Sequence, residues 1–115
     1  MALSLFAEIH VRDLRASRTW YVRLLGEPTF AAHETEEVWE LAENRSIVVE
    51  EQPARAGQSA VTVLVDDLDA LDELVETVAA RGLEPSVRET YGDGVRKVTF
   101  YDPDGNEIGF GAVPT

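Results

Sequence analysis

Glu8 and His10 are the pair in this chain whose residue types and spacing most clearly allow chemistry. Residues two positions apart on a β-strand point to the same face. A carboxylate and an imidazole placed in this way can act as general acid and base, or as metal ligands. Glu50, on another predicted strand, could join them. The alternative is that these polar side chains only line a solvent-filled cleft and take no part in chemistry, and the sequence favours this alternative.

Other catalytic arrangements are not recognisable. The chain has no cysteine, which excludes disulfide and thiolate chemistry. No glycine-rich phosphate loop precedes a predicted helix. None of the serines lies in a nucleophile elbow or a Ser-His-Asp arrangement: Ser4, Ser17, Ser46, Ser59 and Ser86.

The segment Asp102–Asn106 reads Asp-Pro-Asp-Gly-Asn, which is typical of a tight turn. Its proline fixes φ, its two aspartates can bond their own backbone, and Gly105 or Asn106 tolerates a positive φ. It therefore predicts a hairpin between two strands, Val98–Tyr101 and Glu107–Gly111.

The sequence repeats itself. Val11–Ala16 recurs 54 residues later as Val65–Ala70, preceded each time by an apolar strand. A helix follows each copy, beginning after an acidic N-cap and closing with a glycine. These residues are Asp13 and Gly26 in the first copy, and Asp67 and Gly82 in the second. We expect one domain over residues 1–115, made of two βαβββ modules at about 1–54 and 55–115.

Two apolar helix stripes, in Arg15–Leu25 and Leu68–Arg81, must be buried against a sheet. Period-two alternation then divides each strand into two faces. The positions expected to face the helices are Ala7, Ile9, Val11, Val61, Val63, Val65, Ile108 and Phe110. The positions expected on the other face are Phe6, Glu8, His10, Ala60, Thr62, Leu64, Glu107, Gly109 and Gly111.

These motifs together resemble the vicinal oxygen chelate superfamily, which includes glyoxalase I, the bleomycin-resistance proteins and the extradiol dioxygenases. Val11–Leu14 and Trp20–Gly26 look like the family's opening "V-x-D-L … F-Y-x-x-L-L-G", and Asp102–Asn106 looks like its closing "D-P-D-G-N". The resemblance covers nearly the whole chain. It implies an α+β fold in which tandem βαβββ modules form a curved mixed sheet around a cleft.

The resemblance also locates a metal site. Metal-dependent members of the family place two ligands from each half in the cleft, usually His and Glu. Counted from the motifs of this chain, the four ligand positions are Phe6, Val48, Ala60 and Gly109. None of these side chains can bind a metal, and Lewis-acid catalysis requires a bound ion. We expect no metal and no cofactor, and an apolar hollow at these positions.

Composition limits the partners. At 115 residues the chain can bury roughly 65% of its unfolded surface, enough for one core. A net charge of −12 opposes binding to nucleic acid; it either serves solubility or attracts cationic ligands. No apolar run approaches the roughly 18 residues of a membrane span, and Met1–His10 lacks the basic region of a signal peptide. We expect a cytoplasmic protein without membrane contact.

The resulting prediction is a homodimer that binds a small cationic or aromatic molecule in its clefts, without a metal, as antibiotic-sequestering relatives do. The alternatives are a metal-dependent lyase, isomerase or oxygenase with a non-standard site at Glu8, His10 and Glu50, and an interaction or regulatory module. The residues expected to line the cleft are Phe6, Glu8, His10, Trp39, Val48, Glu50, Ala60, Thr62, Tyr101, Glu107 and Gly109. An acidic cleft with aromatic walls suits such a ligand.

Overall fold

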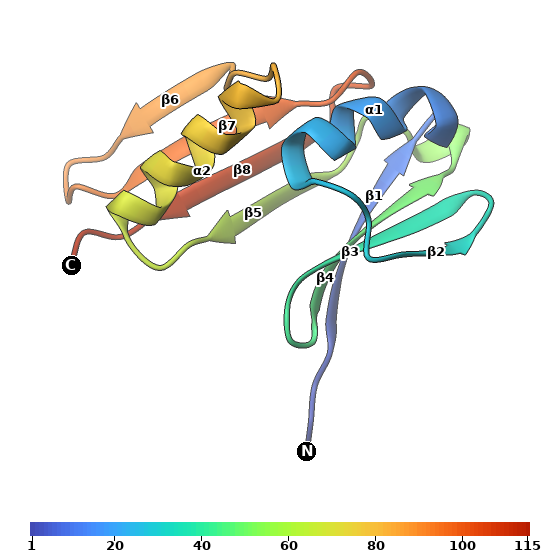
Figure 1. Ribbon diagram of the computed structural model, residues 1–115, viewed down its shortest axis with the longest axis horizontal. Helices are drawn as coiled ribbons and strands as arrows, with labels where there is room; N and C mark the ends of the chain where they lie inside the picture. The colour runs from blue at the N-terminus through green and yellow to red at the C-terminus, as the bar shows by residue number, and fades with distance from the viewer.

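The computed structural model describes residues 1–115 and has two helices and eight strands (Figure 1). The helices are α1 (Leu14–Leu25) and α2 (Leu68–Ala80), and a short 3₁₀ turn covers Pro53–Arg55. The strands of the first half are β1 (Leu5–Val11), β2 (Phe30–His33), β3 (Glu36–Ala42) and β4 (Arg45–Glu51). Those of the second half are β5 (Ala60–Leu64), β6 (Val87–Thr90), β7 (Arg96–Tyr101) and β8 (Glu107–Ala112).

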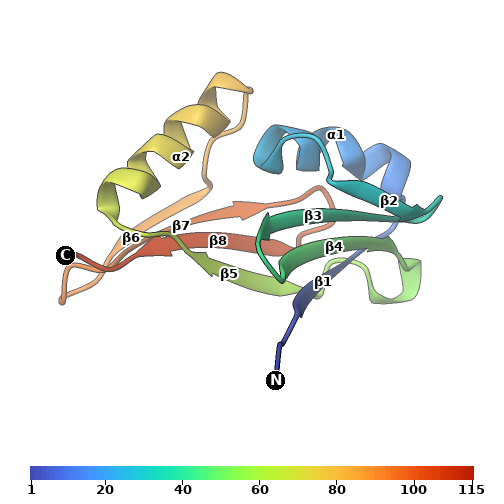
Figure 2. The same ribbon diagram turned by 60° about the horizontal axis from the view of Figure 1, so that its bottom comes forward.

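Each half forms its own four-stranded sheet, in the order β1-β4-β3-β2 and β5-β8-β7-β6. The pairs β1/β4 and β5/β8 are parallel, and all other pairs are antiparallel. Both α-helices lie on the same side of the sheets, so the opposite side carries no α-helix (Figure 2). The predicted α+β class and the βαβββ order of each half are confirmed. The first strands, β1 and β5, are both edge strands.

The helix boundaries follow the predicted capping residues. The Oδ1 atom of Asp13 accepts from the Ala16 amide at 3.1 Å, and that of Asp67 accepts from the Ala70 amide at 2.8 Å. Gly26 follows α1 with a φ of 83°, a conformation that costs glycine little. Neither helix is long and apolar enough to cross a membrane.

One apolar core joins the two halves under the helices. Ile9, Val11 and Ile108 are fully buried, and Phe110 is nearly so, as the alternation predicts. On β5, the side that faces the helices is only partly buried. Its residues Val61 and Val63 nevertheless pack against the same core. The helices contribute to this core mainly Tyr21, Leu24, Leu71 and Val78.

The predicted turn at Asp102–Asn106 forms, with Gly105 at a φ of 94°. Asn106 does not take a positive φ, and both Asp102 and Asn106 are buried. The Asp102 carboxylate accepts from the amides of Asp104 and Asn106, each at 2.9 Å, from Asn106 Nδ2 at 2.8 Å and from the Tyr21 hydroxyl at 2.5 Å. The turn is therefore tied directly to α1.

The same turn also holds the ends of the two edge strands. Asn106 Nδ2 donates to the His10 carbonyl at 2.8 Å, and Asn106 Oδ1 accepts from the Ser59 amide at 2.9 Å. The Arg12 amide donates to Asp104 Oδ2 at 2.9 Å. The end of β1 and the start of β5 are consequently positioned by side chains of the second half.

The Tyr21–Asp102 hydrogen bond should contribute to stability, because removing the hydroxyl leaves a buried carboxylate with one donor fewer. Burial, and then the charge of Asp102, raise the pKa of Tyr21, so its hydroxyl stays a donor at all ordinary pH values. We predict that Tyr21→Phe lowers the free energy of unfolding by about 1–3 kcal/mol in urea titrations.

The matched control is Tyr101→Phe, because Tyr101 is 41% exposed and its hydroxyl makes no hydrogen bond within the chain. Equal stability losses in the two variants would contradict a structural role for the Tyr21 hydroxyl.

Candidate functional site

The candidate site lies on the side of the sheets that faces away from α1 and α2, which we call the open face. On the first sheet, Glu8 lies beside Val48 and His10 beside Glu50, with Phe6 one step further along β1. Phe6 is 57% exposed, while its neighbours on the helix side become buried toward the end of β1. Exposure alternates from Phe6 to Ile9 as predicted, whereas His10, which was expected on the other face, is buried like its neighbours.

A second group of predicted site residues lies on the open face of the second sheet. Thr62 lies beside Gly109, and Glu107 lies between Ala60 and Tyr101. The two groups thus come from different sheets, and none of the three main cavities of the chain is lined by members of both. Whether they face one common cleft stays a prediction.

Trp39 was expected in the cleft, and this expectation is wrong. Trp39 pairs with Ile47 on the helix side of the first sheet and is only 2% exposed. Its indole nitrogen donates to the Gly26 carbonyl at 2.8 Å, and its ring centroid lies 5.9 Å from that of Tyr21. The register of β3 pairs Val38, and not Trp39, with Val48, so Val38 is the residue that lies on the open face.

A row of four titratable side chains crosses the first sheet in direct register. His10 pairs with Glu50, Glu50 with Glu36, and Glu36 with His33 at the end of β2. The shortest nitrogen–oxygen distances are 3.7 Å for His10–Glu50 and 3.8 Å for His33–Glu36. Sequence analysis missed Glu36 and His33, because only the β2–β3 hairpin register brings them into line with Glu50.

The surroundings of Glu36 disfavour the ionisation of its carboxyl group. Partial burial raises the pKa of Glu36 first, and its hydrogen bond with Glu50 and the negative charges of Glu50 and Glu8 raise it further. His33 acts in the opposite direction. The row is therefore an acidic surface that would be stabilised by a proton or by a cationic group placed over it.

The structure does not offer a metal centre. No three His, Cys, Asp or Glu side chains are arranged to hold an ion. The four positions implied by family resemblance carry phenyl, isopropyl and methyl groups and a hydrogen atom, at Phe6, Val48, Ala60 and Gly109. These residues do not fit a metal.

The expected hollow at Gly109 is also wrong, because Lys97 covers this position. A Cβ atom added to Gly109 would lie 2.7 Å from Lys97 Cε and 3.5 Å from its Nζ, and 3.6 Å from Thr62 Oγ1. Sequence analysis did not assign the faces of β7. The pairing of Lys97 with Gly111 and of Thr99 with Gly109 puts the lysine on the open face.

Comparison with known proteins identifies the family to which this chain belongs. The model of the Glyoxalase/Bleomycin resistance protein/Dioxygenase superfamily matches residues 4–110. The crystal structure of a glyoxalase/bleomycin resistance protein from Catenulispora acidiphila is 50% identical, with coverage of 98% of this chain and 100% of that chain and a TM-score of 0.90. A search of curated proteins gave no match.

Two more distant structures share the fold. Lactoylglutathione lyase from Agrobacterium tumefaciens is 16% identical over 97% of this chain and 94% of that chain, with a TM-score of 0.77. A bleomycin resistance determinant encoded on the transposon Tn5 is 16% identical over 99% of this chain and 100% of that chain, with a TM-score of 0.76. The fold thus occurs in a protein named for catalysis and in one named for drug resistance.

The raised pKa of Glu36 predicts a pH dependence of stability. The folded chain holds this proton more tightly than the unfolded chain, so stability present at low pH is lost as the pH rises through the folded-state pKa, above the ordinary value of 4.5. We predict that Glu36→Gln reduces this loss between about pH 4.5 and 7.5, measured by urea unfolding at both pH values. Glu40→Gln, which changes an exposed carboxyl of the same strand, is the control, and equal effects of both variants would contradict the prediction.

Proposed function

Because this chain belongs to the Glyoxalase/Bleomycin resistance protein/Dioxygenase superfamily, we propose that it binds a small organic molecule in a metal-free cleft and leaves the molecule chemically unchanged. The observation that carries this proposal is the set of side chains at the four metal positions. Phe6, Val48, Ala60 and Gly109 supply no nitrogen or oxygen donor. A divalent cation requires several donors that converge on it.

The chemistry of the open face supports an aromatic, cationic ligand. Glu8, Glu36 and Glu50 provide negative charge on the first sheet, and Phe6, which is 57% exposed, provides apolar surface beside it. Pockets for small molecules combine apolar walls with a few polar groups in this way. The net charge of −12 would draw a cation toward this surface.

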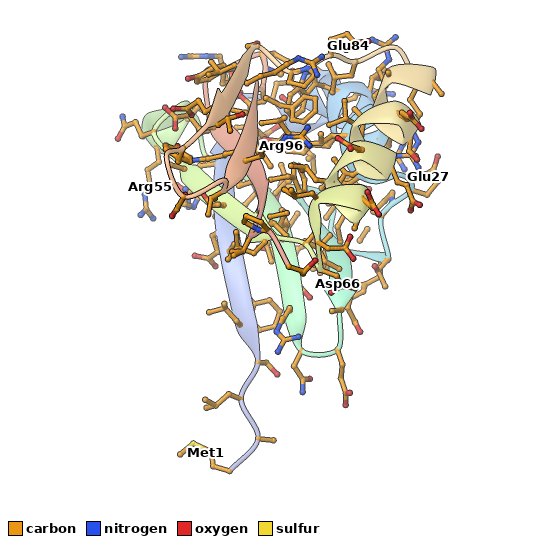
Figure 3. The ribbon with its side chains drawn as sticks, turned by 90° about the vertical axis from the view of Figure 1, so that its left-hand side faces the viewer. Met1, Glu27, Arg55, Asp66, Glu84 and Arg96 are labelled. Atoms are coloured by element: carbon orange, nitrogen blue, oxygen red, sulfur yellow. The ribbon has the colours of Figure 1, made fainter.

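The proposal includes a homodimer, because the edges of the chain are suited to pairing. β1 and β5 are both edge strands, and only the end of β1, at His10, is bonded by Gly57, Ser59 and Asn106 of the same chain. The N-terminal segment before β1 projects from the body and ends at an exposed Met1 (Figures 1 and 3). An apolar groove of about 600 Å³ lies at its base, between β1, the β3–β4 hairpin, β5 and α2.

An exposed strand edge is a template for pairing with another chain, and a large exposed apolar patch commonly marks an interaction site. In a symmetric pair, the open face of the first sheet in one copy could enclose a ligand against the second sheet of the other. This arrangement would bring together the two groups of site residues that a single chain leaves apart.

One observation favours an enzyme as the second candidate. His10 is 7% exposed and lies 3.7 Å from Glu50, which is paired in register with Glu36. Such a group could accept and return a proton. Consumption of a bound compound over time, abolished by His10→Gln, would support this candidate over simple binding.

Thermal unfolding with a panel of ligands tests the proposal, because a compound that binds only the folded state raises the melting temperature. We predict that aromatic cations such as benzyltrimethylammonium raise it in the presence of excess chelator, and that the uncharged analogue neopentylbenzene does not. Glu8→Gln should weaken binding by about 1–3 kcal/mol, the scale of a lost charge interaction.

Glu73→Gln serves as the control, since Glu73 is an exposed carboxylate on α2, away from the open face. Ligand shifts that vanish with chelator, or that Glu8→Gln and Glu73→Gln reduce equally, would count against a metal-free cleft at Glu8.

A further inference from the structure

We propose that Lys97 and Thr62 form an anion-binding subsite above Gly109, on the open face of the second sheet, and that it takes a carboxylate group of the ligand. This inference rests on the proposed function, since it adds a second recognition element for the same molecule. It changes the expected ligand from a simple cation to one that carries both charges.

The geometry of the subsite depends on a glycine. Lys97 starts on β7, and its side chain lies across β8 above Gly109, toward Thr62 on β5. The lysine nitrogen and the threonine hydroxyl both lie within 3.6 Å of the point where a Cβ of residue 109 would be. Any larger residue at 109 would have to displace the lysine. The subsite therefore presents an ammonium group and a hydroxyl, two hydrogen-bond donors, on the same patch of sheet.

The ammonium group lacks a counter-charge within the chain. Lys97 is the only lysine of a protein with a net charge of −12, and it forms no ion pair within the chain. Glu89 lies opposite Lys97 in register, and Glu107 lies two residues from Gly109, yet neither carboxylate comes within ion-pair distance.

The Lys97 residue as a whole is partly buried, beside Gly109 and Thr62. A partly desolvated charge gains more from an opposite charge than an exposed one does. A carboxylate is the fitting ligand group, because it accepts hydrogen bonds from an ammonium and from a hydroxyl at once. The acidic row His10–Glu50–Glu36–His33 lies on the first sheet. The positive group of a ligand would therefore bind to the first sheet, and its carboxylate to the second.

A single lysine makes the subsite directly observable. Reductive methylation with ¹³C-formaldehyde labels only Lys97 and the N-terminal amine, and the dimethylated lysine keeps its positive charge. We expect the Lys97 signal to shift saturably when benzoate is added at constant ionic strength, and not to shift with benzamide. The N-terminal signal should respond to neither compound.

Variants assign the response to the subsite. Lys97→Met and Thr62→Val should each weaken benzoate binding, the former about tenfold or more, as expected for one charge-assisted hydrogen bond. Arg15→Met is the matched control, since it removes an exposed positive charge on α1 and should leave the affinity unchanged. Circular dichroism and sedimentation verify that each variant keeps its fold and assembly.

Two results would overturn the inference. One is a Lys97 signal that does not respond to benzoate. The other is a Lys97→Met variant that binds benzoate normally or that dissociates the assembly, which would assign the lysine to a carboxylate of a second copy. If either result is found and the protein still binds benzyltrimethylammonium, the anion subsite is refuted. The proposed function would then remain intact.

Discussion

The buried carboxylate of Asp102 is the interaction on which the arrangement of this molecule depends. A buried charge is tolerated only when it is fully hydrogen bonded, and Asp102 obtains its donors from its own turn and from Tyr21 on α1. Asn106, held by the same carboxylate, binds the end of β1 and the start of β5. One short turn thereby sets how the first sheet meets the second.

This junction determines what each open face can do. The first sheet gathers carboxylates and two histidines in one row, and the second carries the only lysine above a glycine. Charges of opposite sign on separate sheets suit recognition of a molecule placed between them. Neither surface concentrates the donors that a metal ion requires. The fold is therefore compatible with ligand binding that relies on charge and apolar contact alone.

Sequence reasoning succeeded where the determinants are local. Helix caps at Asp13 and Asp67, the alternation along β5 and that along the first part of β1 follow from neighbouring residues. It failed at Trp39, Glu36 and Lys97, because their faces depend on the register of β3 and β7, which the hairpin turns set. The motif at Asp102–Asn106 was understood only as a turn, since its bonds to Tyr21 and His10 span more than 80 residues.

Metal content is the most direct test of a cleft that works without an ion. Protein purified without chelator should contain far less than one equivalent of Zn, Ni, Mn or Fe per chain by elemental analysis, and chelator should leave its melting temperature unchanged. One tightly held equivalent, lost in Glu8→Ala or His10→Ala, would contradict the account and establish a metal site at these residues.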